Sequence, residues 1–315
     1  MSTLDSDYSP TRAVGLTPIV VVTHNPLKTA LHDCLAALAA STMPTEIVLV
    51  SNGLDISAFK TEHTHTIHLV ENRGYGHAAN AGIAFALSRG YERIALINDD
   101  ITVTPNWLQP LHAYLNTSTN LGAVQPKLLV KGSNPSTINS LGVTLLPNGS
   151  GIDTGFGEID SPAGQAARPI EIFSGGCVLF TRGFLTMTGG FDESYFLYYE
   201  DVDLAIRGSD LGWSYMCVPE STVYHAVEGT QVPVDRRHQH REQSRLRAAV
   251  RFGSATRVIR AYGRALVRIV RYPQPQLLAI AGAIRLLQLD SRFRRERKTL
   301  FPSDTQNANG QAPRA

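Results

Sequence analysis

The sequence predicts an α/β fold in which a mostly parallel central sheet is flanked by helices. The first observation behind this prediction is that short β-branched and aliphatic runs alternate with longer helical patterns over residues 18–97. The second is that these runs are apolar throughout, as in strands that are buried on both faces of a parallel sheet. The third is that several of them end directly in polar residues, where the ligands of such sheets bind.

Local patterns justify each element of the first half. Four short apolar runs predict buried strands, at residues 18–23, 46–50, 66–70 and 93–97. Apolar residues at helical spacing predict one helix after the first strand and one after the third, over residues 27–40 and 77–89. Gly90 closes the second helix, because glycine readily adopts the conformation that ends many helices.

The pattern changes in the second half. From about Leu121 to Ile172, glycine, proline, serine and asparagine punctuate short strands such as 138–145, which predicts a β-rich insertion over one end of the sheet. The remaining expected elements are a buried strand, a helix and two short strands, at residues 175–180, 195–209, 213–218 and 222–225.

A strongly basic region follows. Between Arg236 and Lys298 the chain has 17 Lys and Arg but only 3 Asp and Glu, although the formal net charge of the whole chain is +2. Arginines recur every four residues opposite apolar residues, which predicts amphipathic helices with arginine stripes, at Arg237, Arg241 and Arg245 and at Arg260, Arg264 and Arg268. We therefore expect a flexible N-terminus (1–17) and a catalytic domain (18–230). A basic amphipathic helical region (231–300), with a shorter apolar segment at Leu277–Leu289, and a disordered tail (301–315) follow.

Composition limits the classes of protein. The 315 residues are 43% hydrophobic and 18% charged, which excludes a disordered or fibrous chain. Cys34, Cys177 and Cys217 lie in apolar stretches, and their spacing fits neither a disulfide framework nor a zinc site, so buried thiols in a reducing compartment are expected. The N-terminus lacks the pattern of a secretory signal, and the uncharged stretch 272–284 is too short to span a bilayer. These features predict a cytoplasmic protein, with a peripheral contact at the inner face of the membrane.

Four constellations could carry chemistry. Asn98-Asp99-Asp100 leaves a strand with two adjacent carboxylates, which either hold Mg²⁺ or Mn²⁺ or cap the helix that Thr104-Pro105 opens. Residues 71–77 (ENRGYGH) form a glycine-bearing loop before a helix, which suits either a phosphate or a plain turn. Glu200, Asp201 and Asp203 follow an aromatic run and include a candidate general base, while Asp203 could also pair with Arg207. His225 ends a strand and is either structural or a ligand.

Together these motifs resemble the inverting glycosyltransferases of family 2, which have the GT-A fold, and in particular the rhamnosyltransferase and galactofuranosyltransferase branch. The matching segments cover nearly all of residues 18–230, and they are VVVTHN (20–25), ENRGYGHAANAGI (71–83), LINDDI (96–101), SGGCVLF (174–180), GGFDESYFLYYEDVDLAIR (189–207) and residues 212–225.

The resemblance implies a role for each site residue. Asp100 and His225 match metal ligands, and Asp201 matches the catalytic base. The implied donor-side residues are Thr23, Asn25, Asn52, Asn72, Arg73, Gly74, Asn80, Asn98 and Asp99, and the acceptor-side candidates are Tyr199, Glu200 and Trp213. The chain departs from the family pattern at two positions: Asn98 replaces an acid of the metal motif, and Ser51-Asn52 stands where the family often has Asp-Asn.

The implied reaction is metal-dependent transfer of a sugar, with inversion, from a nucleotide diphospho-sugar to a hydroxyl. The expected donor is dTDP-rhamnose or a UDP-sugar. The expected acceptor is a glycan or a polyprenyl-diphosphate-linked glycan of cell-envelope polysaccharide synthesis, beside an anionic membrane surface. No nucleic-acid partner is expected, because the arginines lack interleaved aromatic platforms, and an oligomer is compatible with the sequence. The alternatives are a metal-dependent nucleotidyltransferase or phosphohydrolase, and a non-catalytic relative that binds glycan or membrane.

Overall fold

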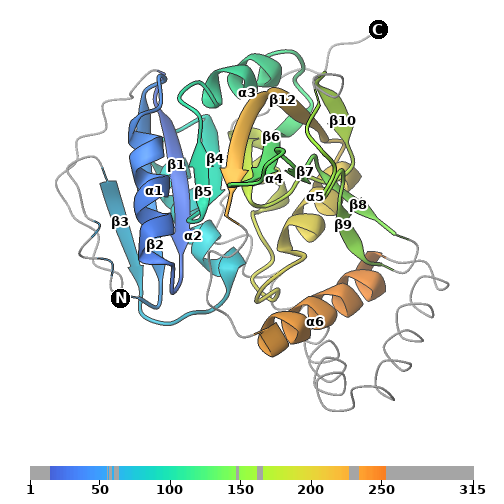
Figure 1. Ribbon diagram of the computed structural model, residues 1–315. Helices are drawn as coiled ribbons and strands as arrows, with labels where there is room; N and C mark the ends of the chain where they lie inside the picture. Colours follow the sequence, from blue (N-terminus) through green and yellow to red (C-terminus); the bar gives the residue numbers. More distant parts are fainter. Residues whose placement is uncertain are drawn as a thin grey trace, which may run out of the picture.

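The computed structural model describes residues 15–252, apart from residues 55, 57–58, 60–63, 147–148, 162–165 and 227–233. One mixed sheet dominates this part of the chain (Figure 1). Its strands follow the order β10-β12-β6-β11-β4-β1-β2-β3, while β5 pairs with β12 and β7 pairs with β6. The bounds are β1 Thr17–Thr23, β2 Thr45–Asn52, β3 Thr64–Leu69, β4 Arg93–Asn98, β5 Ile101–Val103, β6 Leu121–Val130, β7 Ile138–Ser140, β10 Arg168–Ile170, β11 Cys177–Thr181 and β12 Ser214–His225.

Strand direction decides which residues meet. The strands β1, β2, β3 and β4 are parallel to one another. β11 runs antiparallel to both β4 and β6, and β12 is parallel to β6. The carboxyl ends of β1, β2, β4, β6 and β12 therefore share one edge of the sheet, hereafter the carboxyl edge, and β11 begins there.

The helices cover both faces because alternate residues of each strand point to opposite sides. Ile19 and Val21 of β1 face a core with helix α1, whereas Val20 and Val22 face a second core with helix α2. Helix α3 joins α1 on the first face, and helices α4 and α5 join α2 on the other. The bounds are α1 Lys28–Ala39, α2 Tyr75–Ser88, α3 Leu108–Leu115, α4 Arg182–Thr188, α5 Glu200–Asp210 and α6 Val234–Phe252.

The second half differs from the prediction in three places. β6 is a central strand of the sheet and not part of an insertion, since it lies between β11 and β12. The single expected strand 138–145 is split into β7 and β8 (Val143–Leu145), and β8 forms a separate hairpin with β9 (Gly151–Asp153). The two strands expected at 213–218 and 222–225 are one strand, β12, which continues through an irregularity between Val218 and Thr222.

The helix expected at 195–209 begins at Glu200, because Tyr198 and Tyr199 both adopt positive φ angles of 68° and 67°. L-residues avoid this left-handed region, which places Cβ too close to the following carbonyl oxygen. The predicted ion pair inside this helix is confirmed: Arg207 Nε lies 2.7 Å from Asp203 Oδ2, and the guanidinium also donates to the carbonyl oxygens of Thr188 and Gly190.

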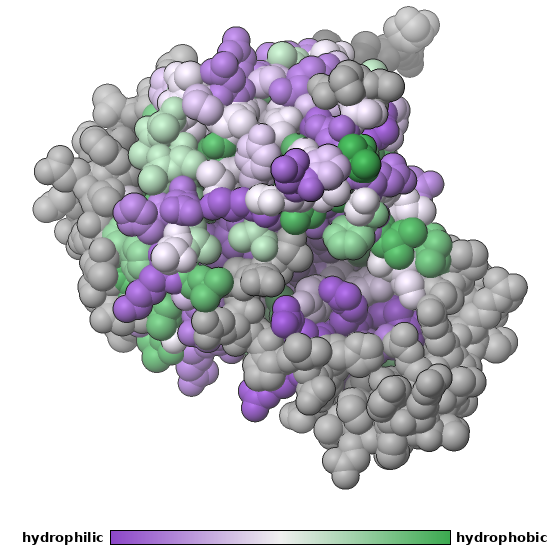
Figure 2. Space-filling model, in the orientation of Figure 1, coloured by the Kyte–Doolittle hydropathy of each residue, from purple (hydrophilic) through white to green (hydrophobic). Residues whose placement is uncertain are grey.

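The basic helix α6 is only partly an exposed arginine stripe. Arg241 is exposed, and Figure 2 shows hydrophilic residues where α6 crosses this face. Arg245, however, is buried and pairs with Glu242 at 2.7 Å, so its charge points into the protein and away from solvent.

Several predicted segments lie outside the described residues: the second stripe at 260, 264 and 268, the apolar segment 277–289 and the tail. Among those described, no helix is long and apolar enough to cross a membrane. The three cysteines are buried and free, as predicted.

The buried pair of Arg207 and Asp203 yields a stability prediction. Arg207→Ala leaves the Asp203 carboxylate buried without its cation, which costs about 3–5 kcal/mol in comparable proteins. We therefore expect the free energy of unfolding, measured by urea denaturation, to fall by about that amount. Lys131→Ala is the control, because Lys131 pairs with Asp33 at 2.8 Å on the surface and should leave the unfolding midpoint nearly unchanged. Equal effects of the two substitutions would contradict this account of the core.

Candidate active site

The carboxyl edge brings together residues that are far apart in the sequence. Thr23, Asn52, Asn98 and His225 are the last residues of β1, β2, β4 and β12. Thr23 donates a hydrogen bond of 2.6 Å from Oγ1 to Asp99 Oδ2, which links the ends of β1 and β4. Burial raises the pKa of Asp99 to about 7. The buried Asp99 carboxyl is therefore fixed between the ends of β1 and β4.

Asp100 and His225 form the second link across the edge. The Asp100 Oδ2 and His225 Nε2 atoms lie 3.1 Å apart, and the backbone N–H of Ala226 donates to the Asp100 carbonyl. On its other side His225 Nδ1 lies 2.9 Å from Asn139 Oδ1, an amide oxygen of β7 that can only accept. When Nδ1 donates to Asn139, a neutral ring directs the lone pair of Nε2 toward Asp100. Two acceptors at this distance repel each other unless a proton or a cation lies between them.

This donor set fits a divalent cation. Metal-binding histidines usually donate their second ring N–H to an oxygen, as His225 does toward Asn139. Mg²⁺ is typically held by one or two carboxylates together with substrate phosphates. Within the described ranges no group of three or more His, Cys, Asp or Glu side chains could hold a metal ion on its own. Asp100 and His225 therefore supply an incomplete set, which substrate oxygens would complete.

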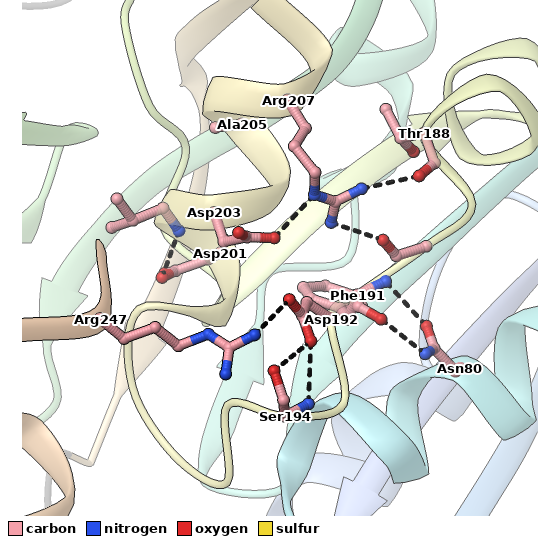
Figure 3. Close-up of polar contacts among 12 residues, drawn as sticks. Asn80, Thr188, Phe191, Asp192, Ser194, Asp201, Asp203, Ala205, Arg207 and Arg247 are labelled. Carbon is pink, nitrogen blue, oxygen red and sulfur yellow. Dashed lines mark hydrogen bonds and ion pairs between the residues drawn. The ribbon is translucent and has the colours of Figure 1, made fainter. Parts of the chain in front are cut away.

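Asp201 lies in the first turn of α5. Its Oδ2 accepts a hydrogen bond of 2.8 Å from the backbone N–H of Gly175, just before β11. Its Oδ1 accepts one of 2.8 Å from the Val202 N–H, and Figure 3 shows Asp201 at the start of α5. The side chain remains partly accessible. Partial burial raises the pKa of Asp201 above its ordinary value, against the lowering effect of the two N–H donors. The result is a fixed, accessible carboxylate, which is what a general base requires.

Glu200 and Asp203 differ from Asp201 in their surroundings. Glu200 is 7% exposed, and its Oε2 atom has no hydrogen-bond partner among the described residues. Burial and the neighbouring Asp201 charge raise the pKa of Glu200, so its protonated form is favoured. Asp203 is fully buried and paired with Arg207. Of the three acids, Asp201 is therefore the strongest candidate for a general base.

The donor-side loop is tied to the end of β2. Asn52 Nδ2 donates to Asn72 Oδ1 at 2.9 Å and to the Gly74 carbonyl at 3.1 Å. Asn72 Oδ1 also accepts from the Gly74 N–H. Gly74 has a φ of 102°, and a Cβ there would lie 2.5 Å from the Phe196 carbonyl oxygen, so no other residue fits. The buried Oδ1 atom of Asn52 has no hydrogen-bond partner in the described structure.

The structure places the other predicted site residues unevenly. Asn25 is exposed just beyond β1, and Arg73 is largely exposed, 3.7 Å from Glu193. Asn80 is buried, with its amide engaged in hydrogen bonds to the Phe191 backbone. Trp213 precedes β12, so it lies at the end opposite to His225 and packs edge-to-face on Phe184. The structure therefore does not bring Trp213 together with His225, because the whole length of β12 separates the two residues.

Three residues of the site were missed by the sequence analysis. Asn139 orients His225, and Gly175 donates to Asp201. The third is Asp153 of β9. Desolvation by the surrounding protein raises the pKa of Asp153, whereas a hydrogen bond with Ser140 and the nearby His225 and Arg241 lower it. The Asp153 charge in turn raises the pKa of Asp201. A lone aspartate in a Gly- and Ser-rich stretch gives no signal in the sequence, because only the fold of the β8–β9 hairpin brings it to the site.

Solved structures and known proteins support this reading of the fold. The structure is similar to that of GalNAc-T7 with UDP, GalNAc and Mn²⁺, with a TM-score of 0.62 at 12% identity, covering 92% of this chain and 58% of that one. The mannosyltransferase PcManGT from Pyrobaculum calidifontis, in complex with GDP-Man and Mn²⁺, has a TM-score of 0.51 at 15% identity, covering 92% and 85%. At such low identity the likeness concerns the fold alone, and it confirms the expected GT-A fold.

Two similar proteins are named as rhamnosyltransferases. The chain is 28% identical over 233 residues to the N-acetylglucosaminyl-diphospho-decaprenol L-rhamnosyltransferase of Mycobacterium tuberculosis, covering 66% of this chain and 75% of the relative. It is 22% identical over 220 residues to the dTDP-rhamnosyl transferase RfbF of Shigella flexneri, covering 68% and 70%. The sequence profile described as "Glycosyltransferase like family 2" matches residues 17–247. Since this match spans most of the chain, the protein belongs to glycosyltransferase family 2.

Proposed function

We propose that this protein is a metal-dependent inverting glycosyltransferase that transfers rhamnose from dTDP-rhamnose to a hydroxyl of a lipid-linked glycan. The observation that carries the proposal is the arrangement at the carboxyl edge. One partly exposed carboxylate, Asp201, is fixed by two backbone N–H groups. The Asp100–His225 pair lies where β12 ends beside the start of β5. A base and a cation site on one edge are the two parts that such a transfer needs.

Asp201 acts as the general base. Its carboxylate takes the proton from the acceptor hydroxyl while the acceptor oxygen attacks the anomeric carbon. The bond to the nucleotide diphosphate breaks on the opposite face, so the configuration inverts and the diphosphate leaves with the bonding electrons. The N–H groups of Gly175 and Val202 hold the carboxylate in place during this step, because each of its oxygens keeps one donor.

Asp100 and His225 would hold Mg²⁺ or Mn²⁺. When bound, the cation offsets the charge that develops on the leaving diphosphate. Asn139 keeps the His225 ring in the orientation that this role requires, and Thr23 orients the adjacent Asp99. On the donor side, Asn52, Asn72 and the Gly74 backbone form one hydrogen-bonded unit, which we assign to the nucleoside part of the donor.

Two relatives support the choice of substrates. Both are named as rhamnosyltransferases, one for dTDP-rhamnose and the other for a diphospho-decaprenol acceptor. A lipid-linked acceptor would bring the protein to the inner face of an anionic membrane. That contact stays a prediction, because the second arginine stripe lies outside the described residues and Arg245 of the first is buried. Cytoplasmic localisation likewise stays a prediction.

A donor screen tests the proposed function. Nucleotide sugars that bind the native state stabilise it by mass action, by about 2.7 kcal/mol at a hundred times the dissociation constant. We expect dTDP-rhamnose with Mn²⁺ to raise the melting temperature more than UDP-glucose, GDP-mannose or dTDP-glucose. Stabilisation by another nucleotide sugar alone would reject rhamnose. Formation of pyrophosphate, or hydrolysis without transfer, would favour the nucleotidyltransferase or phosphohydrolase alternative.

The choice of base gives a second prediction. Asp201→Asn keeps the shape of the side chain but cannot take the proton, so we expect the transfer rate to fall by about 10²–10⁴-fold with little change in donor affinity. Glu200→Gln is the matched control, since glutamine resembles the protonated form that burial favours at this position. The two rates are measured by the release of nucleotide diphosphate in the presence of acceptor. Full activity of Asp201→Asn together with an inactive Glu200→Gln would assign the base to Glu200.

The cation site gives a third prediction. Asp100→Asn removes a charged oxygen ligand, so Mn²⁺ should no longer increase the thermal stabilisation that dTDP provides. The exposed substitution Asp33→Asn also removes one aspartate charge and should leave the Mn²⁺ effect intact. An unchanged Mn²⁺ effect in Asp100→Asn would mean that the cation binds elsewhere.

A further inference from the structure

The segment that leads into the catalytic base is held by helix α6. This segment, residues 189–199, connects α4 to α5 and has no regular secondary structure, yet several of its residues are buried. Asp201 follows it directly. Because an irregular segment cannot fix itself through a backbone ladder, its position depends on contacts with neighbouring elements.

Helix α2 holds the beginning and middle of the segment. Asn80 Nδ2 donates to the Phe191 carbonyl at 2.9 Å, and Asn80 Oδ1 accepts from the Phe191 N–H at 2.9 Å (Figure 3). The Tyr75 N–H donates to the Phe196 carbonyl at 2.9 Å. These contacts fix the backbone near Phe191 and Phe196. Tyr198 and Tyr199, which directly precede α5, are held by other elements.

Helix α6 holds the segment from the other side. Arg247 and Asp192 form an ion pair of 2.9 Å in which the two side chains are 1% and 0% exposed. Figure 3 shows Arg247 reaching Asp192 from α6, while Asp192 also accepts from Ser194. The guanidinium of Arg247 lies 4.7 Å from the centre of the Tyr195 ring.

Two more turns of α6 contact the residues nearest the base. Ser244 Oγ donates to the Leu197 carbonyl at 3.0 Å. His240 stacks on Phe196, with ring centres 4.7 Å apart. Arg241 lies over the Tyr198 ring at 4.7 Å. The helix therefore follows the segment from Asp192 to Tyr198.

The backbone conformation explains why such support is needed. Tyr198 and Tyr199 both have positive φ angles, a conformation that costs about 1–2 kcal/mol for each L-residue and persists only when the surroundings enforce it. The Tyr199 hydroxyl is fixed by the β8–β9 hairpin, through hydrogen bonds with the Gly151 N–H and the Gly149 carbonyl. On the side of Tyr198, Arg241 of α6 lies over the ring.

We propose that α6 is a brace for the catalytic base: Arg247, acting through Asp192, is a positioning residue that keeps the Tyr198–Tyr199 turn in place and so holds Asp201 against the acceptor hydroxyl. This inference rests on the proposed function for the identity of the base. A misplacement of a catalytic group by about 1 Å can lower a rate about 10²-fold, so loss of the brace acts on turnover. The donor-side loop, in contrast, keeps its own hydrogen bonds to Asn52 at the end of β2.

The test removes the pair without leaving a buried charge. Arg247→Met alone would leave the buried Asp192 carboxylate without its cation, and such a change can unfold a protein. The double variant Asp192→Asn/Arg247→Met removes both charges, and its asparagine can still accept the hydrogen bond from the Ser194 N–H. The matched control is Asp33→Asn/Lys131→Met, which removes an exposed ion pair of 2.8 Å with the same change of charge.

Two measurements are compared between these variants and the wild type. In hydrogen exchange followed by mass spectrometry, we expect amides of residues 195–203 to exchange at least about tenfold faster in the buried-pair variant, with β1 and β4 unchanged. In transfer from dTDP-rhamnose, we expect kcat to fall about 10²-fold at an unchanged KM for the donor. The control should match the wild type in both measurements.

Three results would overturn the brace: unchanged exchange at residues 195–203, faster exchange spread equally over the sheet, or faster local exchange with unchanged kcat. The exchange measurement does not depend on the substrate. If the wild-type protein transfers no sugar at all, the proposed function fails, whereas the exchange comparison still shows whether α6 holds this segment.

Discussion

Because β1, β2, β4 and β12 run in the same direction, their last residues reach one edge of the sheet although they are up to 202 positions apart, from Thr23 to His225. β11 runs the other way, so the Gly175 N–H just before it meets the start of α5 at the same edge. The candidate metal ligands, the donor-side asparagines and the base all depend on this arrangement. A strand that ran in the opposite direction would leave its last residue at the other edge of the sheet.

The same edge concentrates negative charge, and the protein offsets each carboxylate in its own way. Asp99 accepts from the Thr23 hydroxyl, and Asp100 faces His225. Asp201 accepts from two backbone N–H groups. Asp153 has a hydrogen bond with the Ser140 side chain and lies near His225 and Arg241, and its own charge raises the pKa of Asp201. Carboxylates gathered at this density suit a divalent cation and a base better than a site for a bare phosphate, because a phosphate would be repelled unless a cation accompanied it.

Much of the fold and of the site could be predicted, because strands buried on both faces leave apolar runs and because polar residues at their ends stand out. Asp100, Asp201 and His225 lie in such motifs, and their expected roles came from the resemblance to glycosyltransferase family 2. Other features depended on tertiary contacts. β6 contains Gln125, Pro126 and Lys127 and so does not read as a central strand, although Lys127 is buried with a partner in Asp160. Arg245 was expected in a polar arginine stripe, whereas the buried acid Glu242 pairs with it, and Arg247 pairs with the buried Asp192.

The anomeric configuration of the product tests the central claim most directly. The claim is that Asp201 activates the acceptor hydroxyl for direct attack on the donor sugar. Proton NMR of the first product formed from dTDP-rhamnose reports the configuration of the new bond before any later change. The account predicts a configuration opposite to that of the donor, and formation of this product should depend on Asp201. A product with retained configuration would contradict direct displacement and the role given to this carboxylate.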